Sequence, residues 1–191
     1  MRASLERLFP GLTDGVMTRL CSLVQRRSVG KNTALLRQGE VWDKAFIIEQ
    51  GMLRMAFTRR DGREFNKSFH YEGMLVCPIT EAMTRKGSLF SIHTVEPCEL
   101  LQAPATQLRE CLDAAGAWEP LRTHLLERLV TQKLEREYHL LAMDGRTRYS
   151  HFCRTAPQLA ARVPLAHLAT YLGITDVSLS RIRRSVKPAQ T

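Results

Sequence analysis

The stretch VPLAHLATYLGITDVSLSRIRR, residues 163–184, has the pattern of a helix-turn-helix. Two short helices that cross steeply need a small residue where they approach and a tight turn between them. Ala169 is the small residue, and Gly173 can adopt the positive φ that the turn requires. Pro164 stands where the first helix begins, and the hydroxyl of Thr175 can cap the second. The spacing therefore predicts a helix-turn-helix in this segment.

The second helix of the motif is expected from about Asp176 to Arg184, with one face open to DNA. Arg181 is the candidate for reading a guanine, because a guanidinium can engage O6 and N7 together. Ser178 and Ser180 are candidates for contacts to bases or phosphates. The residues placed for phosphate contact are Thr175, Arg183, Arg184 and Lys187. The alternative interpretation is a basic helical hairpin whose charged face is simply solvated.

The distribution of charge supports a nucleic-acid partner. The 191-residue chain has 28 Lys and Arg against 19 Asp and Glu, a formal net charge of +9. Residues 146–191 carry eight of these basic side chains and one acidic side chain, Asp176, so most of the excess lies in the last quarter of the chain. Positive charge concentrated in a small C-terminal module is typical of a DNA-binding domain.

The segment from Asn32 to Pro104 has the texture of an antiparallel β-structure. Short, partly alternating apolar runs are separated by glycines, and Asp61-Gly62 between two such runs is a strong hairpin signal. Residues 45–49, 91–95 and 99–102 add further strands. One or two amphipathic helices are expected in residues 4–26, and a short one over residues 106–115.

A long helix is predicted from Glu119 to Met143, because no Gly or Pro interrupts it after Pro120, which the first turn of a helix tolerates. Two rows of apolar residues at i, i+4 spacing make its apolar face wider than a lone surface helix needs. The first row is Leu121, Leu125 and Leu129, and the second is Leu126, Val130, Leu134, Tyr138 and Leu141. The helix could pack on the β-structure, or two copies could form a dimer seam. Asp144-Gly145 ends it and marks a domain boundary.

Taken together, these motifs resemble the Crp/Fnr family of bacterial transcription regulators. The resemblance runs through QGEVWDKAFIIEQGMLRMAFTRRDGREF (38–65), which is similar to a cyclic-nucleotide-binding β-roll, then the long helix, GRTRYSHF (145–152) and the helix-turn-helix. It implies an α+β fold with three parts: an N-terminal antiparallel β-roll with flanking helices (1–118), a long dimerisation helix (119–144) and a helix-turn-helix domain (145–191).

The resemblance also implies how such a protein acts. It implies a homodimer paired through residues 119–144, with two recognition helices on a pseudo-palindromic double-stranded DNA operator. Ser180 and Arg181 match residues that the family's recognition helix places on DNA, and Val177 stands where many members have a base-reading glutamate. RNA polymerase is a further partner to expect of such a regulator.

The effector is not specified by the residues. The family's cyclic-AMP sites use a Gly-Glu pair and an Arg-Ser pair, and neither is intact in MLVCPITEAMTRKGSLFSIH (74–93), so the standard cyclic-nucleotide contacts are not expected. The candidates for an effector pocket are Cys77, Glu81, Arg85, Lys86 and Ser88. Cys77-Pro78 is a dipeptide found in some haem sensors, but a buried structural cysteine is the favoured interpretation.

No catalytic or metal-binding motif occurs. The five cysteines have no CxxC spacing and indicate reduced thiols, and the six histidines have no HxH or HExxH spacing. No export signal or membrane span is visible, so a cytoplasmic protein is expected. The leading hypothesis is a dimeric DNA-binding regulator. Its rivals are a ligand-binding module that acts through protein partners and, ranked last, an enzyme that uses Cys77 or the cavity of the β-roll.

Overall fold

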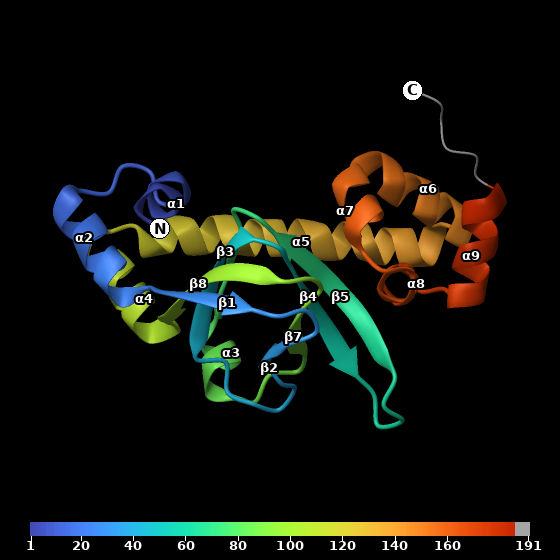
Figure 1. Ribbon diagram of the computed structural model, residues 1–191, viewed down its shortest axis with the longest axis horizontal. Helices are drawn as coiled ribbons and strands as arrows, with labels where there is room; N and C mark the ends of the chain where they lie inside the picture. Colours follow the sequence, from blue (N-terminus) through green and yellow to red (C-terminus); the bar gives the residue numbers. More distant parts are fainter. Residues whose placement is uncertain (186–191) are drawn as a thin grey trace.

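A computed structural model describes residues 1–185 and confirms the α+β architecture (Figure 1). Two helices, α1 (Arg2–Leu8) and α2 (Asp14–Leu23), precede a roll of two four-stranded antiparallel sheets. The strand orders are β1-β8-β3-β6 and β2-β7-β4-β5. The strands are β1 (Gln25–Val29), β2 (Ala34–Leu36), β3 (Lys44–Gln50), β4 (Met52–Thr58), β5 (Glu64–Tyr71), β6 (Leu75–Val76), β7 (Ser91–Thr94) and β8 (Cys98–Pro104).

Some elements of the roll differ from the sequence prediction. Strand β1 begins at Gln25, where a helix was expected to end, and four of its five residues are exposed, so it shows no apolar alternation. A short helix, α3 (Glu81–Arg85), interrupts the second half of the roll without burying any residue. Neither segment has the apolar periodicity that reveals an element in a sequence.

The predicted hairpin at Asp61-Gly62 is confirmed, and it contains an irregularity that matters for the cavity described below. Strands β4 and β5 pair so that Ala56 lies opposite Asn66 and Met55 lies opposite Ser68. Lys67 is therefore an extra residue on β5, which defines a β-bulge.

The roll also contains a close backbone contact at Gly87. The N–H of Gly39 donates to Ser88 O at 2.7 Å, and Gly87 forms an isolated bridge with Val41. A Cβ atom at position 87 would lie 2.3 Å from the carbonyl oxygen of Gly39. Only a glycine fits here without a shift of the backbone.

The C-terminal part of the chain is helical. Helix α4 (Ala105–Asp113) leads into the long α5 (Trp118–Ala142), which is followed by α6 (Gly145–Thr155), α7 (Pro157–Arg162), α8 (Leu165–Leu172) and α9 (Asp176–Ser185). Figure 1 shows α5 running past the roll, with α1, α2 and α4 near one end and α6 to α9 near the other.

The two apolar rows of α5 lie in different environments. Leu121, Leu125 and Leu129 pack against the core formed by α1, α2, α4 and the roll. The second row is mostly exposed, and its most exposed members are Val130, Leu134, Tyr138 and Leu141. The first row therefore packs on the roll together with Leu126, as one interpretation of the helix required. The rest of the second row, from Val130 to Leu141, is exposed in residues 1–185.

Candidate nucleic-acid interface and ligand cavity

Helices α8 and α9 form the predicted helix-turn-helix. Ala169 is fully buried, and Gly173 ends α8 in the left-handed conformation with φ of 67°. The hydroxyl of Thr175 accepts a hydrogen bond from the backbone N–H of Ser178 at 3.1 Å, so it caps α9. Leu179, on the inner face of α9, is fully buried, and it anchors α9 on α8.

The outer face of α9 carries the predicted base-reading residues. Val177 is 60% exposed, and Ser178, Arg181 and Arg184 are also exposed. Residues 177, 181 and 184 are spaced by one and two helical turns, so they form a row along one side of the helix. Ser180 is half-buried, and Lys187 lies outside the described residues.

The other basic residues of the C-terminal module serve different purposes. Arg148 donates to the carbonyl oxygen of Met143 at 2.6 Å and so holds the end of α5. Arg162 donates to both carboxylate oxygens of Glu72, at 2.9 and 2.8 Å, and also contacts Glu96. These two arginines are therefore held within the molecule, and the positive charge open to DNA is concentrated on and near α9.

The helix-turn-helix domain is docked on the outer side of β5. The side-chain amide of Asn66 donates to the hydroxyl of Thr170 at 2.8 Å and to the carbonyl oxygen of His167 at 3.1 Å. Arg136 on α5 donates to Tyr171 O at 2.6 Å and to Asn66 O at 3.2 Å, and its guanidinium lies 4.4 Å from the Tyr171 ring centroid. Three parts of the chain meet at this junction: the roll, the long helix and the helix-turn-helix domain.

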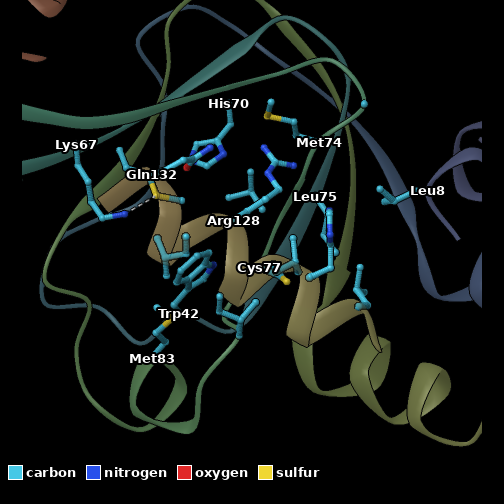
Figure 2. A pocket seen from close by; sticks show the side chains of 18 of the residues that line it. Leu8, Trp42, Lys67, His70, Met74, Leu75, Cys77, Met83, Arg128 and Gln132 are labelled. Carbon is cyan, nitrogen blue, oxygen red and sulfur yellow. Dashed lines mark hydrogen bonds between the residues drawn. The ribbon is translucent and has the colours of Figure 1, made fainter. Parts of the chain in front are cut away.

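A cavity of about 250 Å³ lies between the roll and α5 (Figure 2). Its lining is mainly apolar, and includes Trp42, Met55, Met74, Cys77, Met83 and Phe90. Basic or polar side chains also line it, namely Arg7, Lys67, His70, His124, Arg128 and Gln132. None of the described residues that line it is an Asp or a Glu. The cavity therefore combines an apolar body with a net positive field.

The effector-pocket candidates are not brought together here. Cys77 lines the cavity, whereas Glu81, Arg85, Lys86 and Ser88 do not. Glu81 and Arg85 form an exposed ion pair of 3.2 Å along α3, and Glu81 lines a separate small cavity. Lys86 is exposed, and Ser88 is buried with its hydroxyl donating to Phe90 O. The lining that sequence reasoning missed, above all Trp42 and Lys67, comes from segments distant in the chain.

Burial decides the chemistry of the titratable groups in the cavity. It raises the pKa of the Cys77 thiol to about 12, so the sulfur stays protonated and is a poor metal ligand or nucleophile. It also lowers the pKa of His70 to about 3, with help from Lys67 and Arg128, so this imidazole is neutral.

Residues 1–185 contain no cluster of three His, Cys, Asp or Glu side chains that could bind a metal. No helix of this part of the chain is long and apolar enough to cross a bilayer.

Comparisons with known proteins agree with this architecture. Residues 26–115 match the family model of the cyclic nucleotide-binding domain. No protein of curated function matches the sequence. Among solved structures, FixK2 from Bradyrhizobium japonicum is similar with a TM-score of 0.76 at 13% identity, covering 85% of this chain and 83% of that one.

Two further structures extend the comparison. The c-di-GMP-responsive global regulator CLP from Xanthomonas campestris has a TM-score of 0.72 at 17% identity, with 91% of each chain covered. A Crp/Fnr-family protein from Eubacterium rectale has a TM-score of 0.72 at 14% identity, covering 94% of this chain and 87% of that one. CLP is named as a global regulator, and the Eubacterium rectale protein as a transcriptional regulator. Residues 26–115 are thus similar to a cyclic nucleotide-binding domain, and the chain shares its fold with these solved structures.

Proposed function

We propose that the protein is a homodimeric regulator that binds a specific DNA sequence through α9. The observation that carries this proposal is the exposed row of Val177, Arg181 and Arg184 on the second helix of a capped, well-packed helix-turn-helix. An α-helix fits the major groove of B-DNA, and an arginine there can discriminate a guanine by two hydrogen bonds. Arg183 and Arg184 supply the affinity for phosphate that does not depend on sequence.

The exposed apolar row of α5 supports the dimer. Leu134, Tyr138 and Leu141 are 62%, 60% and 81% exposed, an unusual run on a helix that already buries its other row. Pairing of two α5 helices would remove this surface from water. The dimer would also carry two α9 helices, one from each chain, which would contact two half-sites about one helical turn of DNA apart.

The cavity and the docked DNA-binding module suggest how the activity is controlled. β5 contributes Lys67 and His70 to the cavity and Asn66 to the contact with α8. A ligand that binds with different affinity to the docked and released arrangements would shift the balance between them. The standard cyclic-nucleotide contacts are not part of this proposal, and contact with RNA polymerase stays a prediction.

Selection of binding sequences from a random DNA library tests the proposal. The expected result is a pseudo-palindrome, confirmed by footprinting on the DNA upstream of the protein's own coding sequence. Recovery of no preferred sequence by a folded protein would overturn the proposal and favour the rival, a ligand-binding module that acts through protein partners.

A further inference from the structure

We propose that the cavity between the roll and α5 binds a hydrophobic carboxylate, with Lys67 as the partner of the carboxylate and Trp42 as a second hydrogen-bond donor. This inference concerns the ligand class of the sensor domain, and so it rests on the function proposed above. Three observations carry it: the position of Lys67, the unused donor of Trp42, and the character of the remaining lining.

Lys67 is turned toward the cavity by the β-bulge. Its ammonium group lies 3.9 Å from the sulfur of Met55 and 5.0 Å from the ring centroid of Phe90, both of which line the cavity. No carboxylate pairs with it in the part of the chain that the structure describes. A largely buried ammonium without an anion is costly, because it has lost water without gaining a counter-charge.

The groups around Lys67 also carry an excess of positive charge. Burial, together with Lys133 and Arg136, lowers the pKa of Lys67 to about 8, so the group is still mostly protonated at neutral pH. Arg128 of α5 and the neutral His70 lie on the same side of the cavity as Lys67 (Figure 2). An anion here would meet several positive groups and no negative side chain from residues 1–185.

Trp42 provides the second, independent observation. Its side chain is only 3% exposed, and its Nε1–H has no hydrogen-bond acceptor among the described residues. Buried indole N–H groups usually have a partner, so this unused donor of a cavity-lining residue is a candidate partner for an acceptor on a ligand.

The rest of the lining determines the body of the ligand. Met55, Met74 and Met83 are flexible and polarisable, and they adapt to alkyl chains as well as to rings. On the methionine-lined walls a ribose hydroxyl would meet only thioethers, which are weak acceptors. The combination of one anion-binding end with a methionine-lined body favours a carboxylate on a hydrophobic chain over a nucleotide.

Titration with decanoate tests this inference, with decanol as the neutral counterpart and cyclic AMP as the nucleotide. The two tryptophans are Trp42 and Trp118, so a Trp118→Phe background makes the emission report on Trp42 alone. Below its micelle concentration, decanoate is expected to shift this emission saturably and to give a one-site isotherm by calorimetry. Lys67→Met should weaken decanoate about tenfold to a hundredfold, because it removes a charge-assisted hydrogen bond.

The controls separate charge from general hydrophobic binding. Lys67→Met should leave the weaker binding of decanol unchanged, Lys67→Arg should retain decanoate binding, and Lys31→Met, which removes an exposed lysine, should bind decanoate like the parent. Failure of decanoate to bind, equal decanoate affinity in Lys67→Met, or tighter binding of cyclic AMP would each overturn the inference. Operator selection measured on the same protein is a separate readout, so loss of sequence preference with intact decanoate binding would count against the proposed function alone.

Discussion

The side-chain amide of Asn66 on β5 donates a 2.8 Å hydrogen bond to the hydroxyl of Thr170 on α8, across 104 residues of sequence. The backbone N–H of Asn66 points to the same hydroxyl at 3.3 Å. Asn66 is 2% exposed, so its polar atoms depend on α8 for acceptors. The position of the helix-turn-helix domain is thus coupled to the roll through this buried amide, in addition to the contacts of Arg136 and Arg162.

Thr170→Val tests this coupling. The substitution keeps the shape of the side chain but leaves a buried donor of Asn66 without an acceptor, which should cost about 1–3 kcal/mol in the free energy of unfolding. Urea denaturation measures the cost, and hydrogen exchange should show faster opening of α8. The matched control is Thr123→Val on the exposed side of α5, which should change stability little. Equal stability of both variants would contradict the coupling.

The contact of Arg162 with Glu72 predicts a pH dependence. The Arg162 guanidinium, helped by the backbone N–H of Gly51, holds the pKa of Glu72 at about 2, below its value of about 4.3 in an unfolded chain. A lowered pKa contributes stability that is present above pH of about 4.3 and is lost as pH falls toward 2. The stability difference between the parent and Arg162→Met should therefore shrink over this range.

Measurements of urea unfolding between pH 6 and 2 check this expectation, and an NMR titration of Glu72 should show its pKa rising in Arg162→Met. The exposed pair of Arg122 and Glu119 on α5 is the control. Arg122→Met should produce a smaller pH-dependent difference, because exposed ion pairs contribute little. An unchanged Glu72 pKa in Arg162→Met would show that the contact is not the cause.

The proposed dimer seam predicts that a charge placed within it changes the oligomeric state. Leu134→Lys places a charge in the middle of the exposed apolar row of α5, and should convert dimers to monomers because a buried unpaired charge is unfavourable. Sedimentation velocity measures the change. Gln132→Lys, on the opposite side of α5 from that row, should remain dimeric. Dimers that persist in Leu134→Lys at the same concentration would place the interface elsewhere.

The role of Arg181 predicts a loss of discrimination rather than of all DNA binding. Arg181→Ala should weaken operator binding by about 1–3 kcal/mol and relax the preference at one base pair per half-site. Arg184→Ala should weaken operator and random DNA alike and reduce the salt dependence by about one ion. Fluorescence anisotropy at several salt concentrations distinguishes the two. If Arg181→Ala keeps the parent's ratio of operator to random-DNA affinity, Arg181 does not read a base.

The close approach at Gly87 predicts an asymmetry between two glycine substitutions. Gly87→Ala would place a methyl group 2.3 Å from the Gly39 carbonyl oxygen and should destabilise the protein by about 1–3 kcal/mol. Gly15→Ala on α2 meets no atom within 4 Å and should stabilise it by about 0.5–1 kcal/mol. Thermal unfolding measures both, and a neutral Gly87→Ala would show that the loop yields easily.

The helix-turn-helix could be predicted because its signals are local. The buried Ala169, the turn at Gly173 and the cap at Thr175 all lie within one short segment, and each has a residue type that the backbone requires. The hairpin at Asp61-Gly62 was predictable for the same reason. Elements without apolar periodicity, such as β1, could not be seen.

The cavity could not be predicted, because its residues are assembled by long-range packing. The candidates at 81–88 were adjacent in sequence, but Glu81 and Arg85 pair with each other on the surface of α3. Arg162 belongs to the basic C-terminal module by sequence, yet it contacts acidic groups of the roll. Lys67 lies in a strand whose apolar and polar residues alternate almost regularly in the sequence. Only the pairing of β5 with β4 reveals that it is an extra residue.

Because Lys67 is an extra residue in β5, its charged side chain can be gained or lost without changing the pairing of the residues on either side. Deleting position 67 would leave Asn66 and Ser68 opposite the same partners on β4, Ala56 and Met55, in a regular ladder. A one-codon insertion or deletion can therefore add or remove the cation while the remaining side chains of the strand keep their sides. If the cavity binds a carboxylate as proposed above, this single-residue change would switch its preference between ligands with and without a negative charge.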